Sequence, residues 1–192
     1  MSSAPQLLGD AVASAATSAV AALRPGGVTR VHKFGGSSVA DADRIASLAP
    51  LVDDGADVRV VVVSAMAGAT NALVAMAAQA AAGQDWSGEW AALRERHLAT
   101  AATIDPGDRH GLRDAVARDF DGLRDDLLAL ASATGDTTAL VAQVHGAGEL
   151  VSSRLVQAAL GGEAAGWQRL DARDVLVVQP GEMGVAVDWE AS

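Results

Sequence analysis

The sequence predicts an α/β fold built around a mainly parallel sheet. Two segments, Thr29–Phe34 and residues 57–63, are rich in β-branched and aromatic residues, and each leads through a turn of small residues into a stretch with helical spacing. Consecutive strands joined by helices form right-handed crossovers, which make neighbouring strands parallel. The 192 residues, half of them hydrophobic, are enough for one domain of ordinary size.

The remaining elements follow from hydrophobic spacing and from the turn residues Gly, Pro, Asn and Asp. Thr70 is the expected N-cap of the helix that follows the second strand. The expected helices cover residues 6–23, 39–52, 70–82, 89–103, 109–133 and 138–160. Short strands are expected over residues 165–170 and 175–178, and residues 184–189 form another strand or an irregular edge. We therefore expect a helical extension over residues 1–28, followed by the main domain over residues 29–192.

Composition narrows the classes of partner. The net charge of −10 disfavours nucleic acid, because phosphate backbones are bound by basic patches. The chain has no cysteine, which excludes disulfides and thiolate chemistry and is compatible with a cytoplasmic location. Residues 1–6 carry no basic side chain and Asp10 interrupts the apolar run that follows, so we expect no signal peptide. No segment reaches the roughly 18 uninterrupted apolar residues of a membrane span, and we expect no membrane partner.

The turn after the first strand has the composition of a phosphate-binding loop. Its residues are Lys33, Phe34, Gly35, Gly36, Ser37 and Ser38. Glycines let the backbone approach phosphate oxygens, serine hydroxyls donate hydrogen bonds, and lysine supplies positive charge. The C-terminal edge of a parallel sheet is also where α/β proteins bind ligands, and helix N-termini there attract anions. Lys33 is the only lysine among 14 basic residues, which favours a specific role over that of a surface lysine beside an ordinary glycine turn.

Two further segments carry polar groups in apolar surroundings. The turn after the second strand offers Ser64, Thr70 and Asn71 around small residues, as a ligand loop or a simple capped turn would. Glu149 lies in an otherwise apolar helix, where an unpaired carboxylate is costly. Its partner is a ligand ammonium group on one interpretation, and Arg154 or a helix N-terminus on the other.

The histidines and the segment after residue 170 have structural interpretations. The four histidines are scattered along the sequence, so we expect no metal site. We expect His32 to pack beside its strand. We expect Asp171, Arg173 and Asp174 to form a local ion pair or cap rather than catalytic groups.

Taken together, these segments resemble the aspartate kinases, which are members of the amino-acid kinase family. The matching stretches are Val31-His32-Lys33-Phe34-Gly35-Gly36-Ser37-Ser38-Val39-Ala40, Val62-Val63-Ser64-Ala65-Met66-Ala67-Gly68-Ala69-Thr70-Asn71-Ala72-Leu73, Gly148-Glu149-Leu150-Val151-Ser152-Ser153-Arg154-Leu155 and Leu170-Asp171-Ala172-Arg173-Asp174-Val175. Three motifs in this order are specific, and the resemblance extends from about Val31 to the end of the chain. It implies a three-layer α/β/α arrangement with a mainly parallel sheet, the amino-acid kinase fold, incomplete at the C-terminus.

The resemblance also implies a reaction and a role for each matching residue. The reaction transfers the γ-phosphoryl group of ATP, with Mg²⁺, to the side-chain carboxylate of L-aspartate, the first step in making lysine, threonine and methionine. Lys33 would neutralise charge on the transferring group. Thr70 and Glu149 would bind aspartate. The nucleotide phosphates would be held by Lys33, Phe34, Gly35, Gly36, Ser37 and Ser64. Because the attacking carboxylate is already ionised at neutral pH, no general base is required.

Parts of the family pattern are absent from this sequence. The usual Gly-Arg-Gly-Gly-Ser-Asp segment and the regulatory amino-acid-binding domains do not appear, so we expect the 192-residue chain alone to be inactive. Apolar helix faces that would be exposed favour self-association, and we expect the full-length protein to be a homo-oligomer. The extension before residue 29 resembles bifunctional aspartokinase–homoserine dehydrogenases. Two alternatives stay open: another amino-acid kinase, acting on glutamate, acetylglutamate or a nucleotide, and a non-catalytic binding or assembly module that retains the fold.

Overall fold

The strands β1 (Thr29–Phe34) and β2 (Val58–Val63) pair in parallel, with Lys33 opposite Val62 and Phe34 opposite Val63. One more backbone hydrogen bond extends the pairing into the following turn, where the Ser64 N–H donates to the Phe34 carbonyl at 3.0 Å. The first two predicted strands and the parallel α/β arrangement are therefore confirmed.

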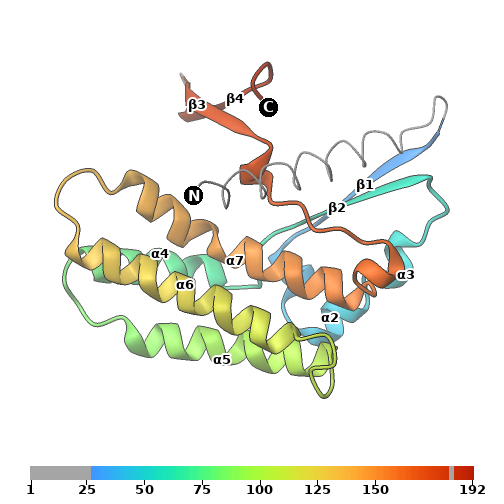
Figure 1. Ribbon diagram of the computed structural model, residues 1–192, viewed down its shortest axis with the longest axis horizontal. Coiled ribbons are helices and arrows are strands. Elements are labelled where there is room, and N and C mark those ends of the chain that lie inside the picture. The colour runs from blue at the N-terminus through green and yellow to red at the C-terminus, as the bar shows by residue number, and fades with distance from the viewer. Residues whose placement is uncertain (1–26, 182–183) are drawn as a thin grey trace, which may run out of the picture. The chain divides into compact units, whose positions relative to one another are not determined.

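The computed structural model describes residues 27–181 and 184–192 (Figure 1). Residues 28–167 form one unit, and residues 168–192 belong to a second, which is described by itself below. The expected helix over residues 6–23 lies outside the described residues. None of the described helices has the length and apolar character needed to cross a membrane.

The single helix predicted over residues 39–52 is wrong. Three short pieces take its place: η1 (Gly36–Val39), α2 (Ala42–Ala46) and α3 (Ala49–Val52). Asp41 starts α2 afresh, because its carboxylate accepts a hydrogen bond from the Arg44 N–H at 2.8 Å. Pro50 lies in the first turn of α3, where its missing N–H costs nothing. The apolar spacing marked buried positions correctly, but they belong to separate turns.

Four long helices form most of the core, and all four were predicted. They are α4 (Ala69–Ala81), α5 (Ser87–Ile104), α6 (Leu112–Ser132) and α7 (Thr138–Ala159). Figure 1 shows them grouped beside the β1–β2 pair, and α7 contacts both α6 and β2. The buried face of α6 repeats at three- and four-residue intervals, through Leu112, Val116, Phe120, Leu123, Leu127 and Leu130.

The sequence suggested Thr70 as the N-cap of α4, and this prediction is wrong. The N-cap is Gly68, whose φ of +77° lies in the left-handed region that glycine adopts without strain. The Ala69 N–H then donates to the Met66 carbonyl at 2.9 Å. Thr70 consequently occupies the first turn of the helix, exposed to solvent.

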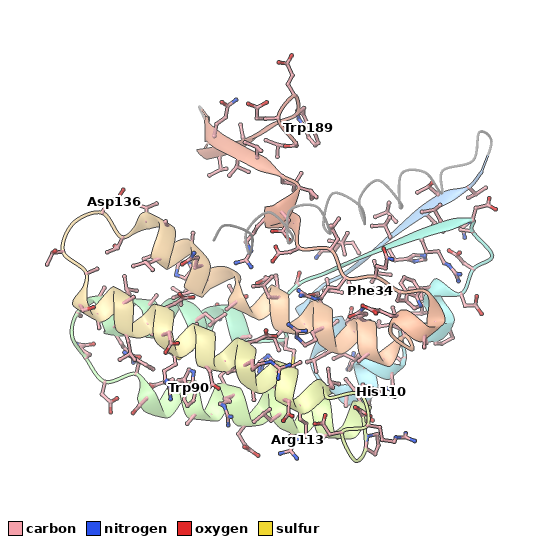
Figure 2. The ribbon with its side chains drawn as sticks, viewed as in Figure 1. Phe34, Trp90, His110, Arg113, Asp136 and Trp189 are labelled. Atoms are coloured by element: carbon pink, nitrogen blue, oxygen red, sulfur yellow. The ribbon has the colours of Figure 1, made fainter. Side chains whose placement is uncertain are left out.

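The two faces of the β1–β2 pair differ. Phe34, Val61 and Val63 pack against the helical core, and Figure 2 shows Phe34 where β1 ends beside the helices. The other face carries exposed Val31, Val60 and Val62, together with exposed Lys33. This alternation follows from the two-residue repeat of a strand, and it places Lys33 on the face away from the core.

Residues after 160 depart from the prediction in one place. Residues 165–170 form no strand, because η2 (Glu163–Ala165) is followed by Gly166 in the left-handed region at φ +82°. In the second unit, β3 (Val177–Gly181) and β4 (Gly184–Asp188) form an antiparallel pair. The expected local ion pair is confirmed there, since Arg173 contacts Asp171 at 2.7 Å beside η3 (Ala172–Asp174).

Candidate active site

Lys33 lies over the glycine turn that follows β1. Its Nζ is 3.6 Å from the position that a Cβ on Gly35 would take. The side chain is exposed, and no other described residue forms an ion pair with it. The turn itself closes through a 2.9 Å hydrogen bond from the Ser38 N–H to the Gly35 carbonyl, which leaves Ser37 exposed. An unpaired ammonium group above a short backbone loop is suited to binding an anion.

The first two motifs are in backbone contact. A Cβ on Gly36 would lie 2.8 Å from the carbonyl oxygen of Ala65 and 3.6 Å from the Cα of Ala67. Such an approach is open only to glycine, because real Cβ atoms essentially never come closer than 3.0 Å to another heavy atom. The two strand-end turns therefore meet, as the parallel pairing of β1 and β2 requires.

The third motif reaches the same alanine from α7. A Cβ on Gly148 would lie 2.7 Å from the Cβ of Ala65 and 3.2 Å from Cδ1 of Leu73. Both Gly148 and Ala65 are buried, and Ala65 is 3% exposed. All three segments singled out in the sequence thus converge on one residue, Ala65.

Glu149 follows Gly148 on α7, and the described residues offer its side chain no partner. The alternative in which Arg154 pairs with it is wrong, because the Arg154 guanidinium binds Asp119 of α6 through hydrogen bonds of 2.7 and 2.9 Å. Among the described residues, none forms a hydrogen bond or ion pair with the half-buried Glu149 side chain. A half-buried carboxylate without a partner is suited to a cationic ligand group.

The other candidate residues differ in how far their side chains are exposed to solvent. Ser64 is half-buried and joins the two turns through its backbone, while Thr70 is exposed in the first turn of α4. Phe34 points its ring into the core, so only its backbone is available to a ligand. His32 packs as expected, with its ring 6.3 Å from that of Phe34 and its Nε2 3.0 Å from an Asp54 oxygen, in an orientation that makes no hydrogen bond.

Comparison with known proteins agrees with this arrangement. The family model described as the amino acid kinase family matches residues 28–182, which include every element of the candidate site. The chain belongs to the amino acid kinase family. Its α/β core is the fold of that family, and its three motifs lie within the matched residues.

This member of the amino acid kinase family is similar to aspartokinases in sequence. It is 34% identical over 155 residues to bifunctional aspartokinase/homoserine dehydrogenase 1, chloroplastic, of Arabidopsis thaliana, a match covering 78% of this chain and 17% of that protein. It is 35% identical over 125 residues to lysine-sensitive aspartokinase 3 of Escherichia coli strain K12, covering 65% of this chain and 27% of that one.

The solved structures agree. E. coli aspartokinase III in complex with lysine and aspartate (T-state) superposes with a TM-score of 0.72 at 30% identity, covering 85% of this chain and 36% of that one. The same enzyme in complex with aspartate and ADP (R-state) superposes with a TM-score of 0.71. The chain therefore spans about a third of those structures, and a smaller share of the plant relatives.

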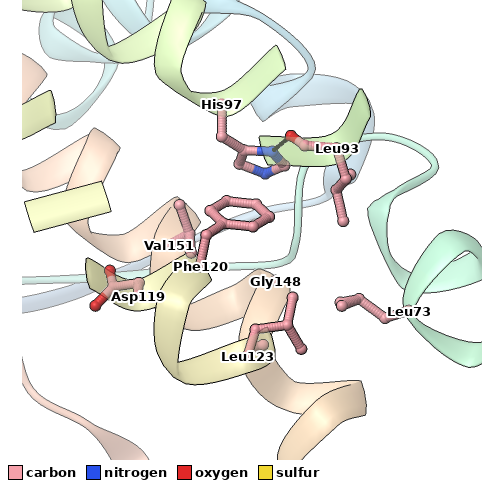
Figure 3. A pocket seen from close by; sticks show the side chains of 9 residues that line it. Leu73, Leu93, His97, Asp119, Phe120, Leu123, Gly148 and Val151 are labelled. Atoms are coloured by element: carbon pink, nitrogen blue, oxygen red, sulfur yellow. Dashed lines mark hydrogen bonds between the residues drawn. The ribbon is translucent and has the colours of Figure 1, made fainter. Parts of the chain in front are cut away.

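The sequence did not indicate the hollow that lies between the four long helices (Figure 3). His97 lines it and is fully buried. Its Nδ1 donates to the Leu93 carbonyl at 2.7 Å, and its Nε2 has no hydrogen-bond partner in the part of the chain that the structure describes. Burial lowers the pKa of His97 to about 4, so the ring is neutral at pH 7. The other lining side chains are mostly apolar, including Leu73, Phe120 and Val151, so the hollow does not suit a charged substrate.

Proposed function

We propose that the protein transfers the γ-phosphoryl group of ATP to the side-chain carboxylate of L-aspartate. The convergence of Gly36 and Gly148 on Ala65 carries the proposal, because it brings a lysine-bearing glycine turn and an unpaired glutamate to the same strand-end turn. Similarity to E. coli aspartokinase III, solved with aspartate and ADP, supports the choice of both substrates.

The Lys33 turn is the proposed phosphate side of the site. The ammonium group over Gly35 offers positive charge to the γ-phosphoryl oxygens, where negative charge spreads in the transition state. Backbone N–H groups of the turn, with the hydroxyls of Ser37 and Ser64, supply the remaining donors. Gly36 lets the backbone, rather than a side chain, face the phosphates.

Glu149 and Thr70 form the proposed aspartate side. The Glu149 carboxylate accepts hydrogen bonds from the substrate ammonium group, which supplies the partner that the described part of the chain does not. The exposed Thr70 hydroxyl lies in the first turn of α4, where the helix dipole favours a substrate carboxylate.

Positioning and charge neutralisation account for the proposed chemistry. A side-chain oxygen of aspartate forms a bond to the γ-phosphorus as the bond to the bridging oxygen breaks, and ADP leaves with that electron pair. No proton has to be removed from the ionised nucleophile. Mg²⁺ would enter with the nucleotide, mainly on its phosphates. The described residues offer no cluster of three metal-binding side chains, so we assign none to it.

Trapping the acyl phosphate as its hydroxamate tests this function in the full-length protein. We expect ATP-dependent hydroxamate formation with L-aspartate and background levels with glutamate or acetylglutamate. A nucleoside monophosphate gives no acyl phosphate to trap, so ADP release is measured for that acceptor, and we expect background levels there too. Preference for one of those acceptors would replace aspartate kinase with another activity of the family. Titration calorimetry showing that neither Mg-ATP nor aspartate binds would favour a non-catalytic module.

We also propose that the full-length protein self-associates and acts in the cytoplasm. Exposed Val74 of α4 and Leu128 of α6 support self-association, because apolar side chains on exposed helix faces can be covered by a partner. The absence of cysteine is compatible with a reducing compartment. Sedimentation equilibrium and cell fractionation test the two proposals separately.

A further inference from the structure

We propose that Ala65 is a spacer that fixes the separation between the Lys33 turn and Glu149, with Gly36 and Gly148 as the two surfaces that rest on it. Ala65 and Gly148 are positioning residues, because they act through groups that would touch the substrates, whereas Gly36 belongs to the proposed phosphate-binding turn itself. The inference rests on the proposed function, but its structural half can be measured without any turnover. It goes beyond the site residues by assigning a role to Ala65 and Gly148, two positions that have no reactive group.

The turn carrying Ala65 is held at both ends. The Ser64 N–H is bonded to the Phe34 carbonyl at 3.0 Å, and the Ala69 N–H to the Met66 carbonyl at 2.9 Å. Both Ala65 and Met66 are buried, at 3% and 1% exposed. The turn therefore has little freedom to move. A side chain added at one of the two glycine contacts displaces the segment that makes the other contact.

The two contacts use different atoms of Ala65. Gly36 rests on its carbonyl oxygen, at 2.8 Å from a Cβ built there, whereas Gly148 rests on its methyl group, at 2.7 Å. Removing the methyl group in Ala65→Gly therefore makes room for a methyl at residue 148 and none for a methyl at residue 36. The remaining neighbour of Gly148 under 3.4 Å is the end of the Leu73 side chain, at 3.2 Å, which needs to shift by only a few tenths of an ångström.

Gly146 supplies a matched control on α7. A Cβ there would meet nothing within 4 Å, and it lies two residues before Gly148 in the same helix. Alanine is favoured over glycine in a helix interior at both positions. Any loss seen in Gly148→Ala but not in Gly146→Ala is therefore due to the contact with the turn.

A methyl group at residue 148 should push the turn and α7 apart while leaving each side of the site intact. In the full-length protein we expect Gly148→Ala to lower kcat about tenfold or more, since small misplacements of reacting groups are costly. The KM for ATP should stay within about threefold, because the phosphate loop itself is unchanged. Ala65→Gly should restore most of kcat to the Gly148→Ala variant, but none of it to Gly36→Ala.

Thermal unfolding of the same proteins gives the readout that needs no substrate. We expect Tm to fall by about 5 °C in Gly148→Ala, to recover in the double variant with Ala65→Gly, and to hold or rise in Gly146→Ala. If Gly148→Ala does not fold, the double variant with Ala65→Gly still tests the proposal, because the proposal requires that variant to fold and to be active.

Three outcomes would contradict the proposed role of Ala65 as a spacer. The first is that folded Gly148→Ala keeps a kcat within about threefold of wild type. The other two are that the double variant is no better than Gly148→Ala in Tm and kcat, or that Ala65→Gly restores activity to Gly36→Ala. A wild-type protein without aspartate kinase activity would instead remove the proposed function and the catalytic role of the spacer, while the Tm comparison still tests the packing.

Discussion

The guanidinium group of Arg154 on α7 binds the carboxylate of Asp119 on α6 through two hydrogen bonds, 2.7 Å from Nε and 2.9 Å from Nη2. Both side chains are about three-quarters buried, at 26% and 23% exposed. The pair joins the two helices one turn beyond Glu149, and it occupies the arginine that could have neutralised that glutamate. The same contact thus fixes α7 and leaves Glu149 available.

Breaking this pair from one side should destabilise the chain. Arg154→Met leaves the Asp119 carboxylate unpaired at the edge of the apolar hollow, and we expect a loss of about 1–2 kcal/mol in the free energy of unfolding. Urea denaturation measures it. The double variant Asp119→Leu with Arg154→Met should recover much of the loss, while Asp53→Asn, at a carboxylate 83% exposed, should change stability by less than about 0.5 kcal/mol. Equal effects of Arg154→Met and Asp53→Asn would contradict a structural role for the pair.

Glu149→Gln should weaken the proposed binding of aspartate to the full-length protein. The amide keeps the shape of the side chain but loses the charge that attracts the substrate ammonium group, so we expect the KM for aspartate to rise about tenfold or more. The KM for ATP should change little. Glu163→Gln, at an exposed carboxylate in η2, is the control. A KM for aspartate that is the same in the Glu149 and Glu163 variants would remove Glu149 from the site.

Lys33→Ala should reduce kcat by about a hundredfold or more, since a cation on the transferring phosphoryl group contributes chiefly in the transition state. Lys33→Arg should recover only part of this loss, because a planar guanidinium does not replace a compact ammonium. Arg44→Ala, at another exposed cation, should leave turnover unchanged. Steady-state kinetics with saturating substrates make the comparison, and near-normal turnover of Lys33→Ala would show that the lone lysine has another role.

The sequence predicted the local elements better than the contacts between them. Two strands and four long helices follow from β-branched runs and from repeats such as that of α6, which depend on each segment alone. The helix over residues 39–52 failed because buried residues of three short turns imitate one helical face. Thr70 failed as a cap because Gly68, with φ +77°, could start the helix first.

The candidate site shows the same division. Chemistry-bearing residues such as Lys33 and Glu149 could be selected from the sequence, because their surroundings made them unusual. Ala65 could not, since its importance lies in two glycine contacts made by segments distant in the chain. Asp119 lies 35 residues from Arg154, and no local pattern joins them. Such pairings depend on how helices cross, which the sequence of one helix does not specify.

His97 should make the stability of the chain depend on pH. Its ring is fully buried, and burial lowers the folded-state pKa to about 4 from an ordinary value of 6.5. Below pH 6.5 the unfolded chain binds a proton that the folded chain excludes. Stability from this group is therefore complete above pH 6.5 and is lost as the pH falls toward 4, by at most about 3 kcal/mol.

Urea denaturation at several values between pH 7 and pH 4 measures this dependence. His97→Leu has no titrating ring and also loses the hydrogen bond to the Leu93 carbonyl, so we expect a lower stability at pH 7 but a shallower decline on acidification. His110→Gln, at an exposed histidine, should keep the wild-type slope. If His97→Leu declined as steeply as wild type, the acid sensitivity would have to come from carboxylates such as Asp54, whose pKa is lowered by the Ala56 N–H and by Arg30.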